Sequence, residues 1–288
     1  MNAPHTTLIE VDQLSGHLGA PDWVVIDCRF TLSEPLLGDA AYQKSRIPGA
    51  RYADLERDLS GPRRPGSGRN PLPEPSDFAA TLARWGVGPE SQVVVYDDSF
   101  GSIACRLWWL LRQAGHTKVA LLNGGWPVWK RKKLPIEEGA PIDDPALPTP
   151  YPLHPASALL ADTPLVEAIR QDPAWALIDA RPEERYSGER ETVDAIGGHI
   201  PGSRHWTFED NLAFDGRFLS AEELHDNFTT LLGAVPPTQV VHTCGSGVTA
   251  CHNVLAMEHA GLNGSRLYAG SWSQWISDPA RPVATGTD

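Results

Sequence analysis

The stretch Val-Val-His-Thr-Cys-Gly-Ser-Gly-Val-Thr-Ala-Cys at residues 240–251 decides how the chain is interpreted. An apolar run ends in Cys244, a glycine-rich loop follows, and Cys251 comes seven residues later (251 − 244). Residues 94–105 read Val-Val-Tyr-Asp-Asp-Ser-Phe-Gly-Ser-Ile-Ala-Cys, so at an offset of 146 (244 − 98) Cys244 corresponds to Asp98. The sequence therefore predicts two related units in tandem, of which only the second has a nucleophile at this position.

The repeat extends well beyond this stretch. A period near half the chain indicates two duplicated globular domains, whereas solenoid repeats are roughly 20–50 residues long. The further matching pairs are Ile26-Asp-Cys-Arg29 with Ile178-Asp-Ala-Arg181, Ile47-Pro-Gly-Ala50 with Ile200-Pro-Gly-Ser203, and Gly124, Trp126 and Trp129 with Gly270, Trp272 and Trp275.

Short apolar runs alternate with helical patterns in both copies. This alternation predicts an α/β fold in which each copy is a parallel sheet with helices on both faces. Ser76 and Ser220 are predicted helix N-caps, and Glu223 completes a capping box with Ser220. The expected domains are residues 1–140 and 157–288, joined by a proline-rich linker at 141–156. The expected strands are 23–27, 93–97, 118–122, 174–179, 239–242 and 266–268, and the expected helices are 76–85, 103–114, 221–232 and 248–260.

Composition excludes several classes of function. The 288-residue chain has a net charge of −12, so a nucleic-acid partner is not expected. No signal-peptide pattern and no membrane-spanning apolar run are present, which predicts a cytoplasmic protein without a membrane partner. The basic run at 130–133 is interpreted as a solvated helix end. The cysteines Cys28, Cys105, Cys244 and Cys251 lack metal-ligand spacing, so neither a metal nor another cofactor is expected.

Cys244 is the candidate catalytic residue. It ends a predicted strand, and ligands of parallel α/β sheets bind at the carboxyl ends of strands. Gly245 and Gly247 let the loop curl so that its backbone N–H groups face an anion, and the following helix adds its positive end. Both effects favour the thiolate, which is the nucleophilic form. Cys105 and Cys251 lie at equivalent positions inside predicted helices, and we expect them to be buried packing residues.

Three other cysteine chemistries are less consistent with these residues. A cysteine protease needs a partner histidine, but His242 is interpreted as a strand residue. A cysteine phosphatase uses a C-x5-R loop, and here Ala250 stands where the arginine belongs. A metal site needs further ligands at suitable spacing.

The loop Cys244–Ala250 resembles the active-site loop of the two-domain sulfurtransferases, the rhodanese and 3-mercaptopyruvate sulfurtransferase family. Gly-His-Ile-Pro-Gly at 198–202 and Gly-Ser-Trp at 270–272 resemble two further marks of that family. The resemblance covers essentially the whole chain. It implies tandem rhodanese-like domains, the first catalytically inactive, and a sulfurtransferase that forms a covalent persulfide on Cys244.

The resemblance also implies which residues bind the substrate. Arg185 matches the family's substrate-binding arginine, and Arg190 is a second candidate whose alternative is an ordinary surface arginine. The loop residues expected to hold the persulfide are Gly245, Ser246, Gly247, Val248 and Thr249. Arg181 and His199 are interpreted as structural, because similar residues or motifs occur in the first copy. Arg63, Arg64 and Arg69 lie in a Gly/Pro-rich loop and are candidates to face an anionic substrate.

The expected donor is a small anionic sulfur compound, 3-mercaptopyruvate slightly ahead of thiosulfate, because the uncharged loop resembles the mercaptopyruvate enzymes. The acceptor would be a thiol, cyanide or a thioredoxin-like protein. Those enzymes also share a Ser/His/Asp arrangement, to which Ser246, Asn70 and Glu56 correspond here, so the histidine is absent. An alternative function is a persulfide carrier that receives sulfur from a partner protein.

Overall fold

The computed structural model describes residues 3–140 and 149–287 and divides the chain into two compact units. The first unit comprises Met1–Gly61, Leu72–Ala156 and Asp215–Arg217, and the second comprises Pro62–Pro71, Ser157–Phe214 and Phe218–Asp288. Each unit is therefore completed by a short segment from the other half of the sequence. Of the expected linker, residues 141–148 lie outside the described part. Residues 149–156 have no regular structure, and His154 and Ala156 hydrogen-bond Ala114 and Gln113 of the first unit.

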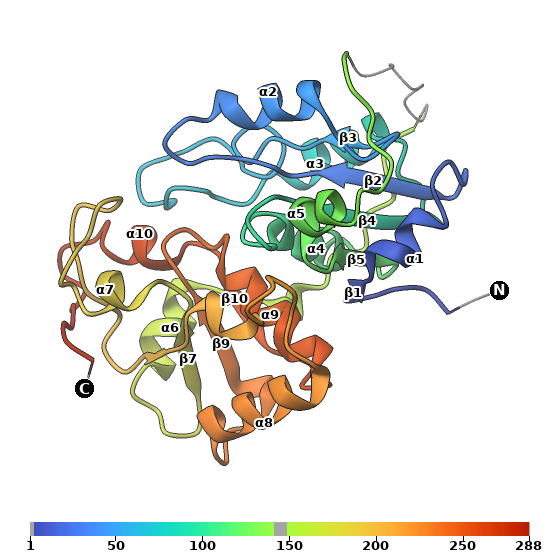
Figure 1. The fold of residues 1–288 in the computed structure, drawn as a ribbon. Helices are drawn as coiled ribbons and strands as arrows, with labels where there is room; N and C mark the ends of the chain where they lie inside the picture. Colours follow the sequence, from blue (N-terminus) through green and yellow to red (C-terminus); the bar gives the residue numbers. More distant parts are fainter. Residues whose placement is uncertain (1–2, 141–148, 288) are drawn as a thin grey trace. The chain divides into compact units, whose positions relative to one another are not determined.

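The first unit is a five-stranded parallel sheet with the order β1-β5-β4-β2-β3 (Figure 1). Its helices alternate with the strands along the chain, as the sequence predicts for parallel pairing. The elements are β1 (Leu8–Ile9), α1 (Val11–Ser15), β2 (Trp23–Asp27), α2 (Leu36–Lys44), β3 (Arg51–Tyr52), α3 (Pro75–Arg84), β4 (Gln92–Tyr96), α4 (Ala104–Gln113), β5 (Val119–Leu122) and α5 (Gly125–Arg131).

The second unit repeats this topology. Its parallel sheet has the order β6-β10-β9-β7-β8, in which every strand takes the place of its counterpart in the first sheet (Figure 1). The elements are 3₁₀ helix η1 (Ser157–Leu159), β6 (Leu160–Ala161), α6 (Thr163–Ile169), β7 (Ala176–Asp179), α7 (Glu183–Tyr186), β8 (Arg204–His205), η2 (Phe208–Asn211), α8 (Ala221–Leu232), η3 (Pro237–Gln239), β9 (Val240–Thr243), α9 (Ala250–His259), β10 (Arg266–Tyr268) and α10 (Ser271–Trp275).

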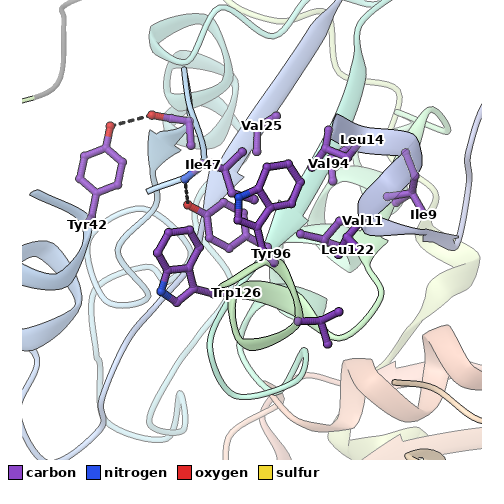
Figure 2. Close-up of a cluster of buried hydrophobic side chains, with 14 of the residues drawn as sticks. Ile9, Val11, Leu14, Val25, Tyr42, Ile47, Val94, Tyr96, Leu122 and Trp126 are labelled. Atoms are coloured by element: carbon purple, nitrogen blue, oxygen red, sulfur yellow. Dashed lines mark hydrogen bonds between the residues drawn. The ribbon is translucent and has the colours of Figure 1, made fainter. Parts of the chain in front are cut away.

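Strand alternation builds the core of each unit. In the first unit Val25, Val94 and Leu122 of three neighbouring strands pack with Val11 of α1 and Trp126 of α5 (Figure 2). The intervening strand residues point to the opposite face, and α4 packs against β4 and β5. The second unit has the matching cluster under α6 and α10, with Leu177, Val241 and Trp272 among its members. Helices on both faces leave the carboxyl ends of the strands as the place where polar loops gather.

One expected helix cap is confirmed and one is wrong. Ser220 caps α8: its hydroxyl accepts the Glu223 N–H, and the Glu223 carboxylate accepts the Ser220 N–H. Ser76 lies inside α3, which begins at Pro75 with Glu74 as the N-cap. Proline is favoured in the first turn of a helix because it has no N–H to satisfy. The helix α3 therefore begins at Pro75, one residue before the predicted start.

The basic run at 130–133 is exposed at the end of α5, as expected. Cys105 and Cys251 are both buried within helices, which confirms their packing role. Among the described residues, no helix is both long and apolar enough to cross a membrane. The same part of the chain contains no cluster of three or more potential metal ligands.

Candidate active site

In the structure, the residue of the first copy that corresponds to Cys244 differs from the one that the sequence predicted. The amide of Trp272 donates to the Cys244 carbonyl at 3.0 Å, and the amide of Trp126 donates to the Asp97 carbonyl at 2.8 Å. The strand register agrees, since Asp27 pairs with Tyr96 and Asp179 pairs with Thr243. Asp97, rather than Asp98, therefore occupies the position of Cys244. The alignment of the two sequences was wrong by one residue, because the second loop is one residue shorter before its helix.

Asp97 shows what the loop after this strand can hold. Its side chain is buried, and its carboxylate accepts four backbone N–H groups of its own loop, from Ser99, Gly101, Ile103 and Ala104, at 2.8–3.0 Å. Burial raises the pKa of Asp97, while these four donors oppose the rise. The first copy therefore contains a ring of amides that already surrounds an internal carboxylate.

In the second copy the equivalent loop follows a thiol. Cys244 is 1% exposed, and its Sγ accepts the Gly247 N–H at 3.2 Å. No acceptor within the described residues takes the amide hydrogens of the other loop residues and the first residue of α9, namely Gly245, Ser246, Val248, Thr249 and Ala250. These amides are therefore available to additional negative charge on or beyond the sulfur.

Two residues fix the shape of this loop. Gly247 has a φ of 74°, and a Cβ there would lie 2.2 Å from the Ala269 carbonyl oxygen, so no larger residue fits. Ser271 also has a positive φ, of 51°. Its hydroxyl accepts the Cys244 N–H at 3.1 Å and donates to the Tyr268 carbonyl at 2.8 Å. The strained backbone of Ser271 is thus offset by two hydrogen bonds that anchor the cysteine.

Two arginines lie against the loop. A Cβ on Gly245 would be 2.9 Å from Arg69 Nη2 and 3.4 Å from Arg185 Nη2. The sequence predicted Arg185 as a substrate-binding residue, whereas Arg69 was only one of three candidate arginines in a loop. Arg69 belongs to the second unit because Pro62–Pro71 packs there, and its backbone N–H donates to Ser273 Oγ at 2.9 Å. The two guanidinium groups therefore lie on the Gly245 side of the loop.

Two carboxylates hold these arginines, and sequence analysis missed both. Asp194 is hydrogen-bonded to Arg69 Nη1 and, at 2.9 Å, to Arg185 Nη2. Glu191 accepts Arg185 Nε at 3.0 Å from both of its oxygens. Burial alone would raise the pKa of Glu191, but the Asp194 amide, the Arg185 guanidinium and the Val193 amide together lower it. The only signal in the sequence was two acidic residues shortly before the Gly-His-Ile-Pro-Gly motif.

Other expected site residues lie elsewhere or have different contacts. The Arg190 side chain is exposed, and no ion pair or hydrogen bond within the described residues joins it to the loop. Thr249 is the N-cap of α9, but its side chain makes no capping bond in the described chain. Ser246 and Asn70 are buried in the second unit, whereas Glu56 is an exposed residue of the first unit.

The residues interpreted as structural form matching contacts in both copies. Arg181 bonds Asp179 at 2.7 Å and lies over the Trp272 ring, while Arg29 bonds Asp27 at 2.6 Å and lies over the Trp126 ring. His199 stacks on Tyr186 and bonds its carbonyl oxygen, so it serves the turn. His242 is completely buried in β9, and burial lowers its pKa to about 3. A neutral histidine with this pKa is not a base that activates Cys244 at neutral pH.

Comparison with known proteins agrees with this geometry. The family model described as a rhodanese-like domain matches residues 10–132 and 163–278. A probable 3-mercaptopyruvate sulfurtransferase of Pseudomonas aeruginosa is 48% identical over 97% of this chain and 98% of its own length. A putative thiosulfate sulfurtransferase of Mycobacterium tuberculosis is 39% identical over the full length of both chains.

Solved structures give the same result. The 3-mercaptopyruvate sulfurtransferase of Leishmania major has a TM-score of 0.83 at 31% identity, covering 94% of this chain and 74% of that one. The corresponding Escherichia coli enzyme has a TM-score of 0.79 at 30% identity, covering 92% of this chain and 98% of that one. The chain belongs to the rhodanese family of tandem-domain proteins. It is an enzyme of the sulfurtransferase class.

Proposed function

We propose that this enzyme transfers a sulfane sulfur from 3-mercaptopyruvate through a persulfide on Cys244. The observation that carries the proposal is the equivalence of Cys244 and Asp97. A ring of amides that surrounds a carboxylate in one copy suits an anionic sulfur in the other. Residues 157–288 are thus the proposed active domain and residues 1–140 the inactive one, with 141–156 between them.

The first half-reaction is a displacement at sulfur. The Cys244 thiolate attacks the donor's sulfur, and the new S–S bond forms as the donor's C–S bond breaks. The electron pair of the broken bond stays on carbon as the enolate of pyruvate, which takes up a proton. With thiosulfate the S–S bond of the donor breaks and sulfite leaves with the pair. In both cases the terminal sulfur of Cys244–S–S⁻ gains negative charge, which the amides of Gly245–Thr249 would hold, aided by the Ser246 hydroxyl.

Arg185 and Arg69 are the proposed donor-binding groups. A guanidinium binds a carboxylate through two parallel hydrogen bonds, and both arginines lie within reach of the loop at Gly245. Arg190 remains a weaker candidate, since no contact described above supports it. Asn70 cannot relay a proton near neutral pH, so the enolate would be protonated by another group or by water.

The second half-reaction returns the thiolate. An acceptor thiolate, cyanide or a thioredoxin-like protein attacks the terminal sulfur, the S–S bond breaks, and its electron pair returns to Cys244. The favoured donor, 3-mercaptopyruvate, is supported by the uncharged Gly-Ser-Gly loop and by the name of the 48% identical relative, and thiosulfate by that of the 39% identical one. The cytoplasm is the proposed location, because all four cysteines are free thiols.

The test is to incubate the reduced enzyme with each donor and measure intact mass, followed by kcat/KM for both donors with one common acceptor. The expected result is a gain of one sulfur that disappears when acceptor is added. The Cys244→Ser variant should gain none. Persulfide that forms only when a donor protein is supplied would contradict small-molecule turnover and support a sulfur-carrier function instead.

A further inference from the structure

The charged groups beside the Cys244 loop are balanced in an unusual way. Arg69 and Arg185 bring two positive charges, and Asp194 and Glu191 bring two negative ones. Asp194 contacts both arginines, one with each carboxylate oxygen, so its negative charge offsets part of the positive charge of both guanidinium groups. Arg181, four residues before Arg185, is bonded to Asp179 at 2.7 Å and lies 3.7 Å from a Glu191 carboxylate oxygen.

Because the two carboxylates are buried, their negative charge acts strongly on a ligand bound near the loop. The Asp194 side chain is 4% exposed and that of Glu191 is 6% exposed, so water and salt screen their charges poorly. The arginines are more accessible, at 19% for Arg69 and 16% for Arg185. A ligand near Gly245 thus meets guanidinium hydrogens directly, while the negative charge of Asp194 acts on it from behind them.

We propose that Asp194 selects the charge of the sulfur donor, favouring a monoanionic carboxylate over dianionic thiosulfate. This inference rests on the proposed function and names the residue that sets its donor preference. The physical reason is that the repulsion between Asp194 and a donor scales with the donor's charge, so it is twice as large in free energy for a dianion. Specificity then comes from a group that disfavours the wrong ligand more than the right one.

The test compares the ratio of kcat/KM for thiosulfate to kcat/KM for 3-mercaptopyruvate in charge variants. Asp194→Asn keeps the size of the side chain and removes its charge, so the ratio should rise about tenfold. This estimate takes one unit charge at roughly 8 Å with an effective dielectric constant of about 30. Arg69→Gln removes a positive charge and should lower the ratio by a similar factor. The double variant has the wild-type net charge and should return to within about threefold of the wild-type ratio.

The matched control is Glu167→Gln. Glu167 is an exposed carboxylate of the same unit and is paired with Arg281 at 2.9 Å, so the substitution makes the same change in net charge away from the loop. Its donor ratio should equal that of the wild type. Should Asp194→Asn and Arg69→Gln shift the ratio in the same direction, or neither shift it, the charge-selection proposal is overturned. Arg69→Gln tests the proposal by itself if Asp194→Asn does not fold.

A binding measurement separates this inference from the proposed function. Calorimetry of each donor with Cys244→Ser, and with Cys244→Ser combined with Asp194→Asn, requires no turnover. Thiosulfate should gain about tenfold more affinity than 3-mercaptopyruvate when Asp194 is neutralised. Equal gains would refute selection by Asp194 even if persulfide forms, whereas unequal gains without persulfide in the wild type would refute only the proposed chemistry.

Discussion

At the scale of single residues, the exchange of Asp97 for Cys244 is the difference between the two copies with the clearest chemical meaning. Asp97 follows β4 and Cys244 follows the equivalent strand β9, and each side chain accepts backbone N–H hydrogen bonds from the loop that comes after it. The Asp97 carboxylate accepts four backbone N–H groups of its loop. The Cys244 sulfur accepts one, which leaves the other loop amides for the outer sulfur of the proposed persulfide. The two copies thus share the fold and differ in the side chain that ends this strand.

We predict that Cys244→Ser abolishes persulfide formation and leaves the fold intact. Serine has nearly the same size, but its hydroxyl is not ionised near neutral pH. Intact mass after incubation with donor, together with circular dichroism, measures both parts of this prediction. The control is Cys251→Ser, which removes a thiol buried in α9 and should retain sulfur transfer. Loss of transfer in both variants would show that a single nucleophile is the wrong interpretation.

We predict that Arg185→Ala raises KM for the donor roughly ten- to a hundred-fold, the cost of a lost charge-assisted contact of about 1.5–3 kcal/mol. The structure adds that this variant also loses stability, because the buried Glu191 would lose the nearer of its two guanidinium partners and keep only Arg181 at 3.7 Å. Arg185→Lys keeps the charge and should recover only part of the affinity, since it lacks the planar fork. Steady-state kinetics and urea unfolding separate the two effects, and an unchanged KM in both variants would remove Arg185 from the donor site.

At the scale of secondary-structure elements, β9 contains a histidine where its counterpart β4 contains Val95. The register places His242 opposite Leu267 and Ile178, as Val95 lies opposite Leu121 and Ile26. Neither ring nitrogen of His242 has a hydrogen-bond partner within the described residues. The element therefore contains a neutral imidazole in an apolar position.

The burial of His242 predicts that the free energy of unfolding falls at acidic pH. Burial lowers the pKa of His242 in the folded protein to about 3, below its ordinary value of 6.5, so the stability that this residue contributes is complete above pH 6.5 and is lost as pH falls toward 3. Between pH 7 and pH 5 the loss in unfolding free energy should be about 2 kcal/mol, at about 1.36 kcal/mol per pH unit below 6.5. His242→Val should remove this part of the pH dependence, as urea unfolding at both pH values would reveal. An equally steep decline in the variant would assign the acid sensitivity to other groups.

The cap of α8 supports a second prediction at this scale. Ser220→Ala removes the acceptor for the Glu223 N–H and should cost about 1 kcal/mol. Ser76→Ala is the control, because Ser76 is an exposed residue inside α3 and alanine is a better helix former. Denaturant unfolding of both variants should show destabilisation only at Ser220. A loss at Ser76 that matched the loss at Ser220 would contradict the observed start of α3.

At the scale of the whole molecule, the two copies differ at two positions of the proposed site. Arg185 lies in α7 directly before Tyr186. The Tyr186 hydroxyl donates to the Ser203 carbonyl as the Tyr42 hydroxyl donates to the Ala50 carbonyl, so Ala41 stands at the position of Arg185 in the first copy. The carboxylate of Asp97 and the missing arginine are therefore the two differences that support the proposal of an inactive first domain.

We predict that Asp97→Cys in the Cys244→Ser background does not restore persulfide formation. The new thiol would lie within the ring of amides, but Ala41 at the position of Arg185 cannot bind an anionic donor. Stability should fall, because four buried N–H groups lose their charged acceptor. Intact mass with each donor is the measurement, and thermal unfolding is the companion. A gain of one sulfur would mean that the ring of amides by itself suffices for catalysis.

The sequence by itself determined the duplicated α/β fold, the elements around it and the candidate nucleophile. Strands β2 and β10 and helix α8 have the predicted bounds, because apolar periodicity and capping residues act locally. The cysteine was evident because glycines that permit a tight loop follow it immediately. Resemblance to a known family then added the sulfur chemistry and Arg185.

The tertiary structure alone decided the rest. It replaced Asp98 by Asp97 as the counterpart of Cys244, since register depends on strand pairing and a one-residue loop deletion leaves little trace in sequence. It also brought Arg69 to Asp194 across 125 residues of chain. Such contacts join side chains whose positions are set by the packing of distant segments, so no local pattern encodes them. The nucleophile is therefore a property of a short motif, and the charge that surrounds it is a property of the folded chain.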